Sequence, residues 1–269
     1  MDLGLNGRVA VVTGGASGIG RAIARELALE KARVAIWDLA SNTVEVAAEL
    51  AKETGAETLG CVVNITDTAT IEAARAATVA KFGPVDHVVH AAAMGSGKFG
   101  FPFTNLTAAD WPRVLDVNIM GMVHVAHAMA PAMMERRSGS FVFIASVAGQ
   151  MGSPTDPPYS ASKAANINFA QCMAKDLASY GVRVNTVCPG MVQTPLNKAV
   201  WKSWHDQQPP DQRQDYETWA GEKVKKVVPL GRWQTPGDIA NMVVFLASPR
   251  AAQITGQTIN VDGGFVMHW

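Results

Sequence analysis

Residues 8–30, RVAVVTGGASGIGRAIARELALE, contain the stretch that decides the fold. A short valine-rich run leads into a glycine-rich turn at residues 13–20, and the turn leads into a segment whose apolar residues recur at helical spacing. Gly14, Gly18 and Gly20 let the backbone approach a pyrophosphate closely, and the start of the helix supplies free N–H donors and a partial positive charge. Because the turn lies between a strand and a helix, it favours a dinucleotide site over a tight turn without a ligand.

The same alternation of short apolar runs and longer amphipathic segments continues along the chain. Strands are expected at residues 8–13, 33–38, 58–63, 85–91, 140–146, 183–188 and 258–261. Helices are expected at residues 18–30, 43–54, 68–82, within 107–136, at 159–180 and at 237–246. Nearly continuous apolar strands between helices predict a parallel sheet with helices on both faces, and right-handed crossovers make it an α/β doubly wound sheet of the Rossmann type. Since no repeat or linker interrupts the pattern, residues 1–269 are expected to form a single domain.

The composition is that of an ordinary globular protein, with 48% hydrophobic and 17% charged residues among 269. Lys plus Arg and Asp plus Glu both number 23, so no basic excess indicates a nucleic-acid or membrane partner. No apolar run approaches the length of a membrane span, and the first residues lack the pattern of a signal peptide. Cys61, Cys172 and Cys188 are widely spaced, which indicates reduced thiols, serving as small core residues, in a cytoplasmic protein.

One segment does not fit the alternation. Residues 197–228 are polar, contain Trp201, Trp204 and Trp219, and are too long for an ordinary connection, so they are either a lid or a disordered insertion. The pair Pro209-Pro210 suits a break between two short helices. We therefore expect a mobile, partly helical lid that closes over the substrate.

Asp38 ends the second expected strand, eighteen residues beyond Gly20. Unless it is only an exposed strand-end residue, its carboxylate can accept hydrogen bonds from both hydroxyls of an adenosine ribose. The same charge would repel the 2′-phosphate of NADP, and neither Ser17 nor Leu39 is cationic, so we expect NAD, with NADP less favoured. Asn64, at the end of the third strand, either binds the adenine edge or belongs to the turn that follows.

Tyr159 and Lys163 are four residues apart and share one face of the expected helix 159–180. A phenol has an ordinary pKa near 10, so it needs a neighbouring cation to exchange protons near neutral pH. Ser146 lies thirteen residues upstream, where its hydroxyl can hold a substrate oxygen beside the phenol. Asn118 lies inside a helix, where an amide needs partners, and it could anchor the water of a proton relay. Taken singly, Ser146 and Asn118 could each be structural.

Together these residues resemble the short-chain dehydrogenase/reductase family over nearly the whole chain. The resemblance is carried by Thr13-Gly14-x-x-x-Gly18-Ile19-Gly20, Asn118, Ser146, Tyr159-x-x-x-Lys163, Pro189-Gly190 with Val192 and Thr194, and Thr255-Gly256-Gln257 with Val261-Asp262-Gly263-Gly264. It implies a seven-stranded Rossmann sheet, NAD(P)-dependent hydride transfer and a homotetramer. It also implies that Tyr159 is the acid–base, Ser146 orients the substrate and Asn118 holds a relay water. Lys163 would bind the nicotinamide ribose and lower the pKa of Tyr159.

The expected cofactor contacts are Gly14, Ser17, Gly18, Ile19, Gly20, Asp38, Leu39, Asn64, Ile65, His90, Ala91, Ala92, Tyr159, Lys163, Pro189, Gly190, Val192 and Thr194. The chain departs from the family after the fourth strand, where His90-Ala91-Ala92-Ala93 replaces the usual Asn-Asn-Ala-Gly. Backbone contacts to the cofactor can remain. The side-chain hydrogen bonds of the asparagines must be replaced, which concerns local stability more than catalysis.

These observations predict an NAD-dependent oxidoreductase that interconverts a secondary alcohol and a ketone, with Tyr159 as acid–base and no metal. A sugar, a polyol or a hydroxy-carbonyl compound is the favoured small-molecule substrate, because the tryptophans can stack on a sugar while His205 and Gln193 lie nearby. A 3-oxoacyl-thioester reductase is the alternative. A redox-inactive dinucleotide sensor is a third possibility, and the complete set of four catalytic residues argues against it.

Overall fold

The computed structural model describes residues 2–98, 102–152 and 156–267. These residues form one seven-stranded sheet in the order β3-β2-β1-β4-β5-β6-β7, with neighbouring strands parallel. The strands are β1 (Val9–Thr13), β2 (Arg33–Asp38), β3 (Thr58–Val62), β4 (His87–His90), β5 (Gly139–Ile144), β6 (Val182–Pro189) and β7 (Thr258–Val261). The strand order reverses between β1 and β4, which confirms the doubly wound Rossmann-type sheet.

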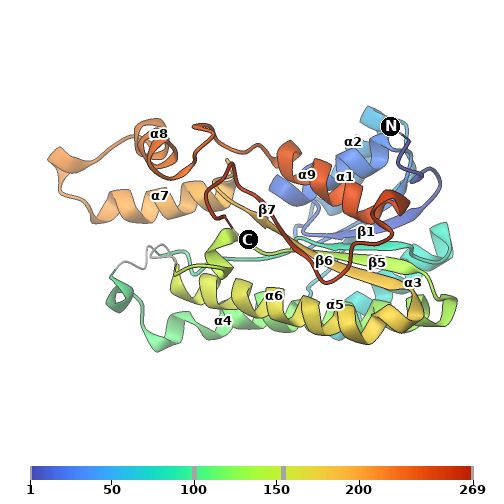
Figure 1. The fold of residues 1–269 in the computed structure, drawn as a ribbon. Coiled ribbons are helices and arrows are strands. Elements are labelled where there is room, and N and C mark those ends of the chain that lie inside the picture. The colour runs from blue at the N-terminus through green and yellow to red at the C-terminus, as the bar shows by residue number, and fades with distance from the viewer. Residues whose placement is uncertain (1, 99–101, 153–155, 268–269) are drawn as a thin grey trace.

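The principal helices are α1 (Gly18–Leu29), α2 (Thr43–Thr54), α3 (Thr68–Phe82), α4 (Pro112–Leu115), α5 (Gly121–Arg136), α6 (Pro157–Leu177), α7 (Pro195–Gln207), α8 (Tyr216–Val227) and α9 (Pro236–Ala247). Helices α1, α2 and α9 cover one face of the sheet, and α3, α5 and α6 cover the other (Figure 1). Short 3₁₀ turns include η1 (Phe103–Asn105), η2 (Ala108–Asp110) and η4 (Val147–Gly149). The expected strands and helices all occur, with ends shifted by three residues at most.

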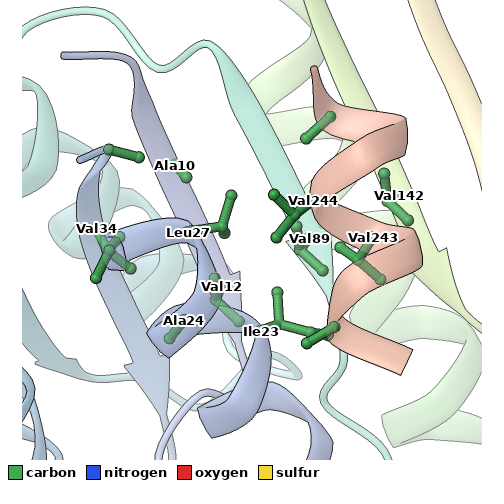
Figure 2. Close-up of a cluster of buried hydrophobic side chains, with 14 of the residues drawn as sticks. Ala10, Val12, Ile23, Ala24, Leu27, Val34, Val89, Val142, Val243 and Val244 are labelled. Atoms are coloured by element: carbon green, nitrogen blue, oxygen red, sulfur yellow. The ribbon is translucent and has the colours of Figure 1, made fainter. Parts of the chain in front are cut away.

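Alternate residues of the inner strands β1, β2, β4, β5 and β6 enter two separate cores. Val12 of β1 packs with Ile23 and Leu27 of α1 and Val243 of α9, all of them fully buried (Figure 2). Val11, the preceding residue of β1, belongs to the core on the opposite face. Burying each such aliphatic side chain contributes about 1.5–3 kcal/mol. Because both faces are dry, the strands are apolar at successive positions, which explains why they stand out in the sequence.

The long helix expected within residues 107–136 is interrupted. A π-helical turn, Asp116–Met120, separates α4 from α5. The helical stretch Ala108–Arg136 is long and apolar enough by composition to span a membrane, with a mean hydropathy of 1.2 in its most apolar window, which the sequence analysis did not expect. Packing accounts for part of the apolar composition, because Met122, Val125 and Met133 of α5 are buried between α5 and the sheet, and 39% of the apolar window is buried.

Two further expectations need correction. Strand β5 ends at Ile144, so Ser146 lies beyond the strand, at the start of η4. Cys188 is buried as a small core residue, whereas Cys61 is half-buried and Cys172 is exposed. The expectation that all three cysteines serve the core therefore holds for Cys188 and, at the edge of the core, for Cys61, and is wrong for Cys172.

Most of the unusual segment 197–228 is helical. Helices α7 and α8 project from the end of the molecule where β6 finishes (Figure 1). They share an aromatic cluster, in which the rings of Trp201 and Tyr216 lie 5.7 Å apart and those of Trp204 and Trp219 lie 5.9 Å apart. The two helices therefore pack as a pair of their own. That this pair moves and closes over a substrate stays a prediction.

Strand β4 starts and ends with a buried histidine. His87 Nδ1 lies 2.8 Å from Ser140 Oγ, and His90 Nδ1 lies 3.0 Å from Thr13 Oγ1. Burial lowers the pKa of His87 to about 4 and the pKa of His90 to about 3. Both imidazoles are therefore neutral in the folded protein at physiological pH.

We predict that the folded protein loses stability as the pH falls from 6.5 to 5. The unfolded chain binds protons at His87 and His90 near pH 6.5, while the folded chain does not until much lower pH. The free energy of unfolding should fall by up to about 1.4 kcal/mol per pH unit for each histidine. Urea unfolding at pH 7, 6 and 5 measures this slope. A His87→Asn/His90→Asn variant should show a flatter slope, and a flat wild-type profile over this range would contradict the assignment.

Candidate active site

The glycine turn lies between β1 and α1, at the carboxyl edge of the sheet. A side chain at Gly14 would put its Cβ 2.7 Å from the backbone N of Ala92, and one at Gly20 would collide with the carbonyl oxygen of Gly14. At Gly18, with φ +53°, a Cβ would meet nothing within 4 Å. Gly14 and Gly20 are thus required by backbone packing inside the protein, whereas a side chain at Gly18 would meet open space. Contacts of these three glycines with a pyrophosphate stay a prediction.

Open space at Gly18 coincides with the first turn of α1. Ser17 is the N-cap of this helix and makes no side-chain capping bond, and the first turn contains no acidic residue. Unused N–H groups at a helix N-terminus attract anions. The backbone here therefore fits the pyrophosphate of a dinucleotide, with Ser17, Gly18 and Ile19 as the residues that would hold it.

Asp38 is fixed against this turn. Its Oδ2 accepts a hydrogen bond from the backbone N of Ala16 at 2.9 Å, and its Oδ1 accepts one from Ala40 at 3.0 Å. Leu39 is 64% exposed beside it and offers an apolar side chain to a ligand. Arg21 is ion-paired with Glu49 at 3.0 Å. The end of β2 thus presents the Asp38 carboxylate. Arg21, at the start of α1, is paired with Glu49 instead of neutralising this carboxylate.

Asn64 and Ile65 have structural partners. Asn64 Oδ1 accepts hydrogen bonds from the backbone N and the hydroxyl of Thr66, at 3.1 and 2.9 Å, so the side chain closes the turn after β3. The carbonyl oxygen of Ile65 accepts a bond from His124 Nδ1 at 3.1 Å. Asn64 therefore belongs to the turn that follows β3, as one of the two expectations had it. Contacts of Asn64 and Ile65 with adenine stay a prediction.

The segment after β4 is bound to the glycine turn through Thr13. His90 pairs with the Thr13 hydroxyl, Ala91 donates its N–H to the Thr13 carbonyl oxygen at 3.1 Å, and Ala92 donates to the Thr13 hydroxyl at 3.3 Å. The ring of His90 also contacts Phe143 edge-on, at 6.1 Å between centroids. His90 therefore bonds to the glycine turn through Nδ1, whereas its buried Nε2 has no hydrogen-bond partner among the residues that the structure describes.

The segment after β6 forms another wall of the site. Pro189 ends β6, and Gly190 packs directly on Asp262, where a Cβ would lie 2.7 Å from the aspartate Cβ. Val192 is buried, and Thr194 is the N-cap of α7, where its hydroxyl accepts a bond from the N–H of Asn197 at 3.3 Å. The chain is held in place by its own contacts here. The proposed contacts to a nicotinamide carboxamide stay a prediction.

The structure brings Ser146, Tyr159 and Lys163 together. Tyr159 and Lys163 lie in the first two turns of α6. The short turn after Ser146 packs on the backbone of this helix so closely that a Cβ at Gly149 would lie 2.6 Å from the carbonyl carbon of Lys163. Lys163 Nζ donates to the carbonyl oxygen of Ile144 at 2.7 Å and lies 5.4 Å from the centre of the Tyr159 ring. The three groups predicted from the sequence thus lie together, with Lys163 buried and with Ser146 and Tyr159 half-buried.

Burial dominates the electrostatics of this constellation. It raises the pKa of Tyr159 well above its ordinary value, and a hydrogen bond with Ser146 acts in the opposite direction. Burial also lowers the pKa of Lys163 to about 8. The expectation that Lys163 lowers the pKa of Tyr159 is therefore not met by the protein groups alone. Lys163 Nζ lies over the ring and is bound to Ile144, so the loss of hydration outweighs its effect on the hydroxyl.

Asn118 lies in the π-helical turn, fully buried. Its Oδ1 accepts a bond from the N–H of Met94 at 2.8 Å, and its Nδ2 donates to the carbonyl oxygen of Met94 and to the hydroxyl of Ser162, both at 2.9 Å. Ser162 in turn donates to the carbonyl oxygen of Tyr159 at 2.7 Å. Both amide hydrogens are used, so Asn118 positions the loop after β4 against α6. A relay water on Asn118 stays a prediction.

Sequence reasoning missed three residues of this region. Met94 and Ser162 are the partners of Asn118, and Asp156 is a buried carboxylate three residues before Tyr159. A carboxylate directly before Pro157-Pro158 and the Tyr159 motif was the available indication. In the part of the chain that the structure describes, no group of three or more His, Cys, Asp or Glu side chains could hold a metal ion.

Comparisons with known proteins agree with this geometry. Residues 14–266 match the family model described as enoyl-(acyl carrier protein) reductase. The chain is 37% identical to acetoacetyl-CoA reductase of Synechocystis sp., over 98% of both chains, and 35% identical to 3-oxoacyl-(acyl-carrier-protein) reductase of Escherichia coli, over 98% of this chain and 100% of that one. Among solved structures, L-sorbose reductase from Gluconobacter frateurii, complexed with NADPH and L-sorbose, covers both chains completely with a TM-score of 0.89 and 28% identity.

Proposed function

Because the chain belongs to the short-chain dehydrogenase/reductase family, we propose that it interconverts a ketone and a secondary alcohol by hydride transfer with a nicotinamide dinucleotide. The observation that carries this proposal is the grouping of Ser146, Tyr159 and Lys163 at the same edge of the sheet as the glycine turn. A phenol, a hydroxyl and an ammonium in this arrangement serve a reaction in which a proton moves on or off a carbonyl oxygen.

The bound dinucleotide supplies or accepts the hydride. In reduction, the Ser146 hydroxyl orients the carbonyl oxygen, and Tyr159 gives its proton to this oxygen as negative charge develops there. The raised pKa of Tyr159 keeps the phenol protonated at neutral pH, which is the form that reduction requires. In oxidation the same phenol oxygen takes the proton of the alcohol. Lys163, held by Ile144, supplies a positive charge beside the ring and hydrogen-bond donors toward a ribose.

For the cofactor we infer a preference for NAD over NADP. The support is Asp38, whose carboxylate is fixed beside the glycine turn, and the engagement of Arg21 by Glu49. The sorbose reductase that resembles this chain binds NADPH, so a 2′-phosphate is compatible with the fold in general. The local charge at the end of β2 is the reason for expecting the opposite preference here.

The sequence comparisons favour the alternative, reduction of a 3-oxoacyl thioester, because the two relatives described above carry such substrates in their names. An acidic carrier protein would need free cations beside the site. In the α7–α8 pair, Lys202 pairs with Asp206, and Lys198 and Lys223 lie over the rings of Tyr216 and Trp219, whereas Lys225 and Lys226 are exposed. A small hydroxylated ketone, as in the sorbose reductase, is the substrate class that we favour.

The remaining parts of the proposal follow the family resemblance and the neutral charge balance. We propose a homo-oligomer, a tetramer by resemblance, in the cytoplasm, with a small-molecule substrate and without nucleic-acid or membrane partners.

A substrate screen tests the proposed function. The purified protein is assayed by nicotinamide absorbance with NAD(H) and NADP(H) against sugars, polyols, hydroxy ketones, cyclic ketones and acetoacetyl-CoA. Turnover of a ketone or secondary alcohol supports the proposal. Turnover confined to acetoacetyl-CoA selects the alternative, and no turnover of any carbonyl compound together with tight dinucleotide binding indicates a sensor.

We predict that Tyr159→Phe lowers kcat at least about 100-fold and leaves dinucleotide affinity nearly unchanged, because the lost hydroxyl acts on the proton in the transition state. Lys163→Met should lower both kcat and dinucleotide affinity, since two roles are assigned to it. Tyr180→Phe removes a hydroxyl from a 3₁₀ turn outside the site and serves as the control. Retention of more than about a tenth of wild-type kcat in Tyr159→Phe would remove Tyr159 from the acid–base role.

We predict that the wild-type protein prefers NAD over NADP by at least about tenfold in kcat/KM, because Asp38 repels the 2′-phosphate. Asp38→Ser should narrow this ratio, chiefly by improving NADP, and should weaken NAD through the lost ribose hydrogen bonds. Arg21→Gln is the matched control and should leave the ratio unchanged, since Arg21 is paired with Glu49. An NADP preference in the wild type, or an unchanged ratio in Asp38→Ser, would show that another residue selects the cofactor.

A further inference from the structure

Asp156 is a buried carboxylate that the mechanism above does not use. It directly precedes α6, and its side chain is only 6% exposed. Its Oδ2 accepts a hydrogen bond from the backbone N of Ser96 at 2.8 Å, whereas its Oδ1, also buried, has no hydrogen-bond partner among the residues that the structure describes. Leaving a buried charged oxygen without a partner is costly, so such a group calls for an explanation.

Asp156 lies against two segments that approach the start of α6. Gly95, in the loop after β4, lies against it, since a Cβ at Gly95 would be 2.7 Å from Asp156 Oδ2 and 3.3 Å from Leu196 Cδ1. Leu196 is in the first turn of α7. The carboxylate therefore lies where the loop after β4, the start of α6 and the start of α7 meet. Its charge reaches the phenol of Tyr159, whose pKa it raises.

The chemistry of this group limits what it can bind. Burial raises the pKa of Asp156, while the backbone N–H groups of Ser96 and Tyr159 act in the opposite direction. In its ionised form the carboxylate only accepts hydrogen bonds, so it recognises a donor and repels another acceptor. The carbonyl oxygens of a 3-oxoacyl thioester are acceptors, whereas a hydroxyl group is a donor. A substrate hydroxyl close to the reacting carbon would donate a hydrogen bond to Oδ1 and offset part of the free energy lost when this oxygen is buried.

Resting on the proposed function, we propose that Asp156 is a specificity-determining residue, which accepts a hydrogen bond from a second hydroxyl that the substrate carries close to its reacting carbon. The substrate class is then a hydroxy ketone or the corresponding vicinal diol. Asp156 selects this class against simple ketones and against 3-oxoacyl thioesters.

Asp156→Asn separates this role from a structural one. The amide oxygen of asparagine can still accept the bond from Ser96, so the loop after β4 stays attached to α6. The amide nitrogen then replaces Oδ1 and turns an acceptor into a donor without changing the size of the side chain. The loss of a hydrogen bond to a charged group is worth about 10- to 100-fold in kcat/KM.

The experiment compares matched substrates with the holoenzyme. 3-Hydroxybutan-2-one and butan-2-one differ by one hydroxyl, and acetoacetyl-CoA represents the thioesters. We expect the wild type to favour the hydroxy ketone and Asp156→Asn to lower the ratio of kcat/KM for 3-hydroxybutan-2-one over butan-2-one by about 10- to 100-fold. Asp176→Asn, which removes an exposed carboxylate near the opposite end of α6, is the control and should leave the ratio unchanged.

Other outcomes overturn the proposal. If Asp156→Asn lowers kcat/KM for both ketones equally, with unchanged thermal stability and dinucleotide affinity, Asp156 is a positioning residue without a role in specificity. If the wild type turns over butan-2-one or acetoacetyl-CoA as well as the hydroxy ketone, donor recognition is wrong while the proposed oxidoreductase function stands. If the wild type turns over no ketone or alcohol in the wider screen, the proposed function fails, and the role of Asp156 fails with it.

Discussion

The packing of the loop after β4 on the glycine turn is the contact on which the site depends. Backbone meets backbone there, because Gly14 leaves no room for a side chain against Ala92, and Gly20 leaves none against Gly14. Thr13 then binds the N–H groups of Ala91 and Ala92 with its carbonyl and hydroxyl oxygens. This contact joins β1 and β4 at the point where the strand order of the sheet reverses, which is where doubly wound sheets bind their ligands.

Hydrogen bonds connect the loop after β4 to the helix that carries the catalytic residues. Asn118 makes two hydrogen bonds with Met94 of the same loop and one with Ser162. Ser162 lies between Tyr159 and Lys163 on α6. A second link is the hydrogen bond from the backbone N of Ser96 to Asp156, which joins the loop to the start of α6. A π-helical turn at residues 116–120 is what directs Asn118 into this network. The dinucleotide half and the catalytic half of the site are thus connected by one loop.

Burial, rather than ion pairing, sets the protonation states in this region. It keeps His90 neutral beside the positively charged Lys163, lowers the pKa of Lys163 and raises that of Tyr159. The protein groups by themselves therefore favour a protonated phenol, which suits reduction of a ketone. Nearby members of the family carry ketoreductase names, in agreement with this direction. The loop after β4, the start of α6 and the start of α7 meet beside these residues.

The amino-acid sequence by itself determined the sheet, its helices, the glycine turn and the Tyr159–Lys163 pair. These depend on local periodicity, on turn residues and on spacing along one helix, which are all readable within short windows. Tertiary structure alone decided that Gly14 and Gly20 serve packing, that the amide hydrogens of Asn118 are engaged with Met94 and Ser162, and that Asp156 is buried with one oxygen unpaired. It also decided the upward direction of the pKa of Tyr159. Each of these depends on burial or on partners from separate segments of the chain, and such contacts leave no periodic pattern in the sequence.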